Sequence, residues 1–160
     1  MHDLTYRYRS EENLVFLRRS HYHIELPVLL DFEYRLNRHV MFLFDTGAYV
    51  TVINKETSLF LGFDRITPLV DDFPLTGISG SLDASLIEIP GMIIGDRTLK
   101  GIKVAVPHED SKCCILGLNV LEHFNYLLDS EHSKIYFNDN KKYKIPDELK
   151  SAEVLSTNLI

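Results

Sequence analysis

The segment VMFLFDTGA, residues 40–48, sets an apolar run directly before a polar turn. Residues 40–44 have the length and composition of a buried strand. The carboxylate of Asp45 follows at once, and Gly47 can form a tight turn behind it. We therefore expect a strand that delivers an aspartate into a rigid loop. An ordinary Asp turn between two strands is the competing interpretation.

Strands are predicted on both sides of this segment. Residues 24–32 and 38–44 are apolar runs separated by the polar residues 33–37, which favours a hairpin. Residues 49–53 are rich in β-branched side chains and predict a further strand. Residues 13–17 form a short apolar stretch that we interpret as an arm or an edge strand.

Most of the remaining chain is predicted to form short strands divided by turns. Strands are expected within residues 73–89, 92–106 and 113–117, and in a closing hairpin over 125–137. Turn residues divide the first two regions at Gly77, 79–81, 90–91 and 95–96. This punctuation is typical of an all-β sandwich or barrel.

Two helices are predicted among these strands. Asn54 can cap a brief helix over residues 55–61, and Gly62 lies where a left-handed residue ends such a helix. Residues 118–124 carry apolar side chains at helical spacing, which predicts the one substantial helix. The polar end of the chain allows a short helix near residues 147–154.

The composition is that of one globular domain. The chain has 160 residues, 45% hydrophobic and 25% charged. Its net charge of -6 gives no general attraction to nucleic acid or anionic lipid, so neither is an expected partner. No signal peptide is visible, and no apolar run approaches the roughly 20 residues that cross a bilayer. A soluble, cytoplasmic protein is therefore expected.

Neither a metal nor a cofactor is predicted. His21 and His23 would share one face of a strand, but zinc needs further ligands at a recognisable spacing, and none is evident. Cys113 and Cys114 are adjacent and badly placed to bridge each other. We expect both cysteines to be reduced core residues.

Four features in order resemble the retropepsin-like aspartic proteases, which are homodimeric relatives of pepsin. They are the apolar strand into Asp45-Thr46-Gly47-Ala48, the β-branched residues 51–53, the hairpin Gly77-Ile78-Ser79-Gly80, and Ile115-Leu116-Gly117 before a helix. The resemblance implies an all-β, retropepsin-like closed barrel or sandwich with a flap hairpin and one short helix after Gly117. It implies a protease domain at residues 22–137, an N-terminal arm or edge strand at 1–21, and a polar tail at 138–160.

The resemblance also implies a role for each motif. Asp45 would be catalytic, and Thr46, Gly47 and Ala48 would support its loop. Gly77, Ile78, Ser79 and Gly80 would form the flap over a bound peptide, with Ile78 touching substrate. Ile115, Leu116 and Gly117 would pass beneath the catalytic loop and support it.

The chain has one such motif, whereas the chemistry needs two carboxylates that face one water molecule. The resemblance therefore implies a homodimer with a shared site, because two like charges about 3 Å apart hold one proton between them. One carboxylate would act as base and the other as acid on a peptide substrate. The alternatives are a catalytically silent dimerisation or peptide-binding module, and an unrelated β-barrel with a chance motif.

Two positions depart from the family pattern. Retroviral enzymes commonly place an acid directly after the Ala and an arginine directly after the later glycine, and the two pair. This chain has Tyr49 and Leu118 there. A differently built loop support is therefore expected. Because a hairpin and a long tail follow the helix, the dimer interface is also expected to differ.

Overall fold

A computed structural model describes residues 14–16, 18–20, 23–31, 38–78 and 80–142 of the chain. Several sequence predictions lie outside these residues. They concern the turn at 33–37, Ser79, His21 and the short helix near 147–154.

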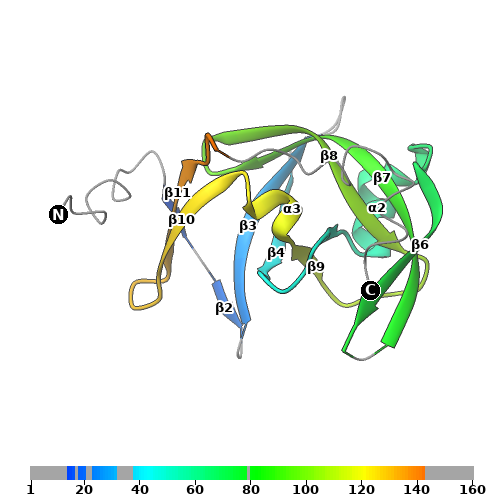
Figure 1. The fold of residues 1–160 in the computed structure, drawn as a ribbon, viewed down its shortest axis with the longest axis horizontal. Coiled ribbons are helices and arrows are strands. Elements are labelled where there is room, and N and C mark those ends of the chain that lie inside the picture. The colour runs from blue at the N-terminus through cyan, green and yellow to red at the C-terminus, as the bar shows by residue number, and fades with distance from the viewer. Residues whose placement is uncertain (1–13, 17, 21–22, 32–37, 79, 143–160) are drawn as a thin grey trace.

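Six strands of the described chain close into a barrel (Figure 1). The order around the ring is β3 (His23–Asp31), β4 (Arg38–Phe44), β9 (Cys114–Leu116), β5 (Thr51–Val52), β8 (Arg97–Pro107) and β7 (Gly80–Ile94). The ring closes because Leu29 to Asp31 of β3 also pair with Gly91 to Ile93 of β7. The predicted all-β closed barrel is therefore confirmed.

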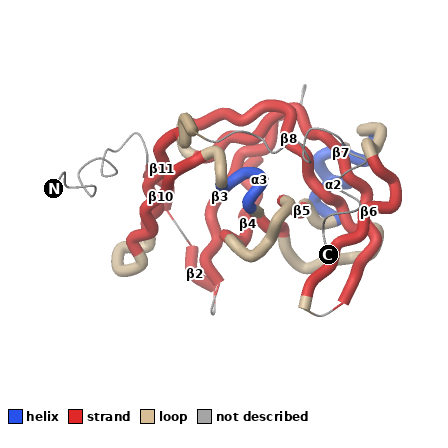
Figure 2. The backbone as a smooth tube through the Cα atoms, in the orientation of Figure 1, coloured by secondary structure: helices blue, strands red, loops and turns tan. Residues whose placement is uncertain are grey.

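Two further strands extend this sheet beyond the ring. β2 (Arg18–Ser20) pairs with β3, and β6 (Val70–Gly77) pairs with β7 in a long hairpin. A second, three-stranded sheet has the order β1 (Leu14–Phe16), β11 (Lys134–Asp139), β10 (Phe124–Asp129) (Figure 2). Both sheets are antiparallel at these pairings.

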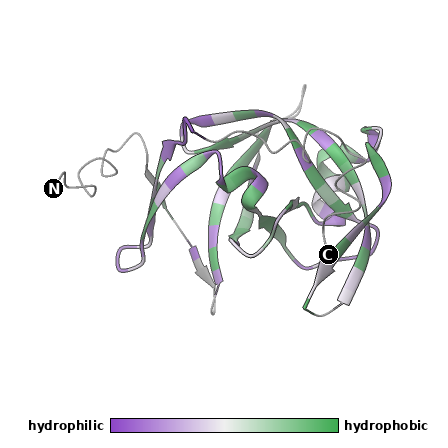
Figure 3. Cartoon of the chain, in the orientation of Figure 1, coloured by the Kyte–Doolittle hydropathy of each residue, from purple (hydrophilic) through white to green (hydrophobic). Residues whose placement is uncertain are grey.

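Side chains that alternate between the two faces of each strand form the core. Leu26, Val28 and Leu30 of β3 are fully buried, as expected for one face of a strand that lines a barrel. Phe42 of β4 and Leu116 of β9 join the same cluster. Figure 3 shows the resulting contrast between the apolar β9 and the polar turn at residues 130–133.

The helices differ from the prediction in their relative lengths. α2 (Lys55–Leu61) has the predicted bounds and caps, because the Asn54 side chain accepts the Thr57 N–H at 2.8 Å and Gly62 has a φ of 76°. The 3-10 turn η2 (Phe63–Arg65) follows it. α3 (Leu118–Leu121) is only four residues long. The short helix implied after Gly117 is therefore confirmed, whereas the prediction of one substantial helix over 118–124 was wrong. The buried Phe124 instead begins β10, where it pairs with Asp139.

Two strand predictions also need correction. Within residues 49–53 only Thr51 and Val52 form a strand. The predicted break at residues 90–91 is absent, because β7 continues to Ile94. The pairing of β7 with β8 skips one position, at which Pro90 lies opposite Gly101. Pro90 has no N–H to donate, and Gly101 has a φ of 62°. The ladder tolerates the proline there.

No helix in the described part of the chain is long and apolar enough to cross a membrane.

Candidate active site

Asp45 follows the last residue of β4 and is fixed by three hydrogen bonds of its loop. Its N–H donates to the Leu116 carbonyl at 3.2 Å, which continues the parallel pairing of β4 with β9. Its Oδ1 accepts the Gly47 N–H at 2.8 Å, and its carbonyl accepts the Ala48 N–H at 3.3 Å. Asp45 is half-buried, whereas Thr46 and Gly47 are exposed. The carboxylate is thus held in a tight turn whose next two residues are exposed.

Space beside Gly47 is tight in this turn. A Cβ at this position would lie 3.1 Å from Asp45 Oδ1, closer than most such contacts. Any larger side chain would press on the carboxylate that the Gly47 N–H orients. The sequence indicated a glycine turn here, and the structure shows that the turn and the carboxylate are one unit.

Residues 115–117 lie directly against the Asp45 loop. Ile115 and Leu116 pair with Leu43 and Phe44 of β4. Gly117 approaches the loop so closely that a Cβ would lie 2.7 Å from the Val50 carbonyl group and 2.9 Å from the Ala48 oxygen. Only glycine fits at this position without a shift of the backbone.

Backbone bonds join the start of α3 to the same loop. The Leu118 N–H donates to the Ala48 carbonyl at 2.8 Å, and the Asn119 N–H donates to the Tyr49 carbonyl at 3.1 Å. These bonds lie at the two positions that depart from the family pattern. Tyr49 is exposed and Leu118 is half-buried, and these two bonds hold the loop through the main chain, whatever the side chains at the two positions.

Asn119 is a structural residue that the sequence analysis missed. Its Oδ1 accepts both the N–H and the Oγ1–H of Thr51 at 2.8 Å, and its Nδ2 donates to the Lys103 carbonyl at 2.7 Å. The fully buried Thr51 Oγ1 in turn accepts the Gly117 N–H at 3.1 Å. Nothing in the local sequence marks Asn119, because its partners lie far away along the chain.

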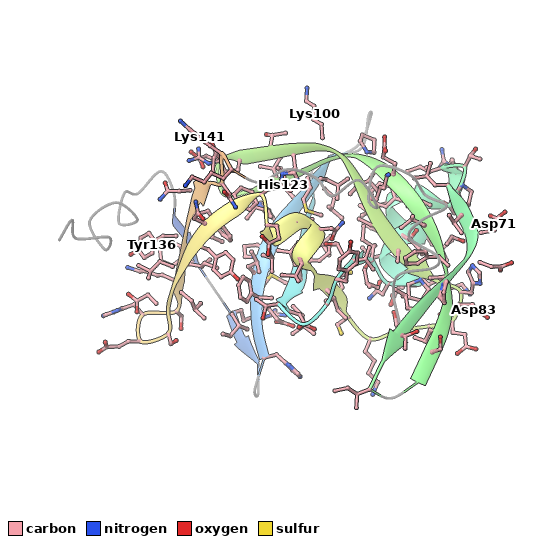
Figure 4. All side chains as sticks on the ribbon, viewed as in Figure 1. Asp71, Asp83, Lys100, His123, Tyr136 and Lys141 are labelled. Atoms are coloured by element: carbon pink, nitrogen blue, oxygen red, sulfur yellow. The ribbon has the colours of Figure 1, made fainter. Side chains whose placement is uncertain are left out.

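The hairpin of β6 and β7 carries the other predicted site residues. Gly77 pairs with Gly80, and Ile78 lies in the turn that follows Gly77. Ile78 is fully exposed at this tip, and Gly80 has a φ of 127°, which favours glycine. Figure 1 shows the hairpin projecting past the Asp45 loop (cyan), and the side chains of Asp71 and Asp83 lie on the two arms of this hairpin (Figure 4).

Burial shifts the pKa of three groups that flank residues 115–121 in the chain. Burial raises the pKa of the Cys114 thiol, which lies in the core. Burial and the nearby Glu25 carboxylate raise the pKa of Cys113, but this residue is only half-buried, so the prediction of two core cysteines holds for Cys114 alone. Burial lowers the pKa of His123, which connects α3 to β10.

The described residues contain no group of three or more His, Cys, Asp or Glu side chains that could hold a metal ion.

Comparison with models of known families gives a match to aspartyl proteases. Residues 35–123, more than half of the chain, match the family model described as "gag-polyprotein putative aspartyl protease". No curated protein matches the chain in sequence.

Solved structures of two aspartic proteases share the fold. A retropepsin-like aspartic protease from Rickettsia conorii is 22% identical with a TM-score of 0.56, over 78% of this chain and 88% of that one. EIAV protease, complexed with the inhibitor HBY-793, is 19% identical with a TM-score of 0.53, over 66% of this chain and 90% of that one.

Proposed function

Because this chain belongs to the retropepsin-like family of aspartic proteases, we propose that it is an endopeptidase that uses Asp45 from each of two copies. The observation that carries the proposal is the setting of Asp45. Its backbone is tied to β9, its Oδ1 is oriented by the Gly47 N–H, and its side chain remains half-exposed. A carboxylate used only for an Asp turn has no need of this second layer of support from β9 and α3.

The chemistry follows from placing two such carboxylates together. Two apposed Asp45 groups share one proton, because both cannot be ionised at short range. The ionised member takes a proton from a water molecule as that water attacks the peptide carbonyl carbon. The protonated member gives its proton to the carbonyl oxygen. The leaving amine then takes a proton from the carboxyl group that received it from water, and the C–N bond breaks. As the tetrahedral intermediate collapses to the carboxylic acid, one of its two hydroxyl groups returns a proton to the other carboxylate, which restores the shared proton.

The hairpin tip supplies the second part of the proposal. Ile78 is fully exposed between the paired Gly77 and Gly80, and a Cβ built on either glycine would meet nothing within 4 Å. The tip therefore has room to move onto a bound peptide. We propose that it acts as a flap that excludes water, with Ile78 in contact with the substrate. The substrate class is an extended, partly apolar peptide.

Replacing the carboxylate is the direct test. Asp45→Asn keeps the oxygen that accepts the Gly47 N–H but removes the acid and the base. We expect loss of peptide hydrolysis with an unchanged unfolding transition. The matched control is Asp64→Asn, at an exposed position in η2, which should retain activity. Full activity in purified Asp45→Asn would refute the assignment, and a wild-type protein that binds peptides without cleaving them would favour the silent module.

A further inference from the structure

One face of the sheet beside the candidate site is formed by half-buried side chains. Residues that pair directly across a sheet point to the same face. Leu43 of β4 pairs with Glu25 of β3 on one side and with Ile115 of β9 on the other (Figure 1). We call the surface formed by these three residues the Leu43 face. The opposite face of the same strands is closed, because Leu26 and Phe42 are fully buried in the core.

Asp45 belongs to the Leu43 face. It lies two positions after Leu43, and its N–H continues the pairing of β4 with β9. Alternation along the strand therefore places its side chain on this face. Glu25 is opposite Leu43, so it lies diagonally from position 45, at about 7–8 Å. A substrate side chain beside the scissile bond would thus lie on Leu43 and Ile115 and reach Glu25.

The Glu25 carboxylate is mostly buried, and only one of its oxygens has a partner. The side chain is 17% exposed. Arg18 of β2 is opposite it in register; its Nε donates to Glu25 Oε2 at 2.7 Å, and its Nη2 lies 2.6 Å from the same oxygen. Within the described residues, Oε1 accepts no hydrogen bond. Because buried polar atoms are normally hydrogen-bonded, Oε1 is suited to accept a donor from a ligand.

The charges around this face favour a cationic ligand. Burial and, after it, the charge of Glu25 raise the pKa of the Cys113 thiol, which immediately precedes β9. Since β4 separates β3 from β9, the Glu25 charge acts across the Leu43 face. Asp71 and Asp83 on the arms of the β6–β7 hairpin have the same sign (Figure 4). Carboxylates on several sides attract a cation and repel an acid.

We propose that Glu25 selects a substrate with a Lys or Arg side chain beside the scissile bond. This inference rests on the proposed function, because it assigns a substrate class to the same site. The methylene stem of such a side chain would pack on Leu43 and Ile115, and its cationic head would donate to Glu25 Oε1. Arg18 keeps its place on Oε2. The preferred substrate is therefore a basic peptide with apolar neighbours.

Cleavage of a mixed peptide library by the full-length chain tests this selection. Mass spectrometry of the products should show Lys and Arg enriched at a position beside the cut. Glu25→Gln keeps the size of the side chain and an acceptor oxygen but removes the charge, so its products should lose the enrichment. For two peptides that differ only by Lys or norleucine at that position, the ratio of their kcat/KM values should fall about tenfold in Glu25→Gln.

Two further variants separate direct recognition from a general disturbance of the site. Arg18→Gln removes a positive charge that opposes the substrate cation, so the Lys to norleucine ratio should rise. A general disturbance would lower the rates on both peptides and leave their ratio unchanged. The matched control is Glu88→Gln, at an exposed acid of β7, and it should keep the wild-type ratio.

The outcomes distinguish this inference from the protease assignment. Wild-type products without Lys or Arg enrichment, enrichment that survives in Glu25→Gln, or a ratio that does not rise in Arg18→Gln would overturn the inference. A chain that cleaves no library peptide would refute the protease assignment instead. Capture of the library on immobilised chain then decides: Lys and Arg peptides retained by wild type but not by Glu25→Gln support the inference, and equal retention overturns it.

Discussion

Gly117 and Val50 lie so close together that a Cβ on Gly117 would come within 2.7 Å of the Val50 carbonyl carbon and oxygen. This contact fixes the distance between the strand end at β9 and the loop that carries Asp45. The loop is bonded on the same side to Leu116 and Leu118. The position of the Asp45 loop therefore depends on residue 117 having no side chain.

Gly117→Ala should displace this loop. The overlap is with backbone atoms, which cannot rotate away, so we expect the free energy of unfolding to fall by about 1–3 kcal/mol. Peptidase activity should be lost even under conditions in which the variant stays folded, because Asp45 moves with the loop. The control is Gly77→Ala, where an added Cβ meets nothing within 4 Å. Denaturant unfolding of both variants checks the prediction, and equal stability of the two would contradict it.

Asn119→Ala removes the side chain that connects Thr51 to Lys103. The buried Thr51 then loses the acceptor for both its N–H and its hydroxyl, and we expect a loss of about 2 kcal/mol in the free energy of unfolding. Asn119→Asp keeps that acceptor but turns a charged oxygen toward the Lys103 carbonyl oxygen, so this variant should be destabilised as well. Urea unfolding checks the prediction, and an Asn119→Ala variant as stable as wild type would contradict it.

These residues also show where sequence reasoning succeeded. The apolar run before Asp45 and the glycine after it predicted a strand and a tight turn, because both signals are local. The role of Asn119 could not be predicted, since its acceptor oxygen serves a residue 68 positions away. The same limit applies to β10. The spacing of apolar residues from Leu118 to Phe124 fits a helix, and only pairing with the later β11 makes Phe124 part of a strand.

Acid should destabilise the folded chain through His123. Burial lowers the pKa of His123 in the folded state below its ordinary value of 6.5. As the pH falls below that value, the unfolded chain takes up the proton more readily, so the free energy of unfolding decreases. Above pH 6.5 His123 is neutral in both the folded and the unfolded chain, so it makes no pH-dependent contribution to the free energy of unfolding.

His123→Gln should reduce this loss of stability between neutral and mildly acidic pH. The control is His39→Gln, at an exposed position of β4. Urea unfolding midpoints, measured from neutral to mildly acidic pH, check the prediction. A His123→Gln variant whose pH dependence matches that of wild type would contradict the burial argument.

The central claim is that one active site needs Asp45 from two copies. Wild-type chain is mixed with increasing Asp45→Asn chain at a constant total concentration well above the dimer dissociation constant, and peptide hydrolysis is measured after exchange. If the site is shared, only pairs of wild-type chains are active, and activity falls with the square of the wild-type fraction. Activity that falls in direct proportion to the wild-type fraction would place a complete site within one chain and contradict the claim.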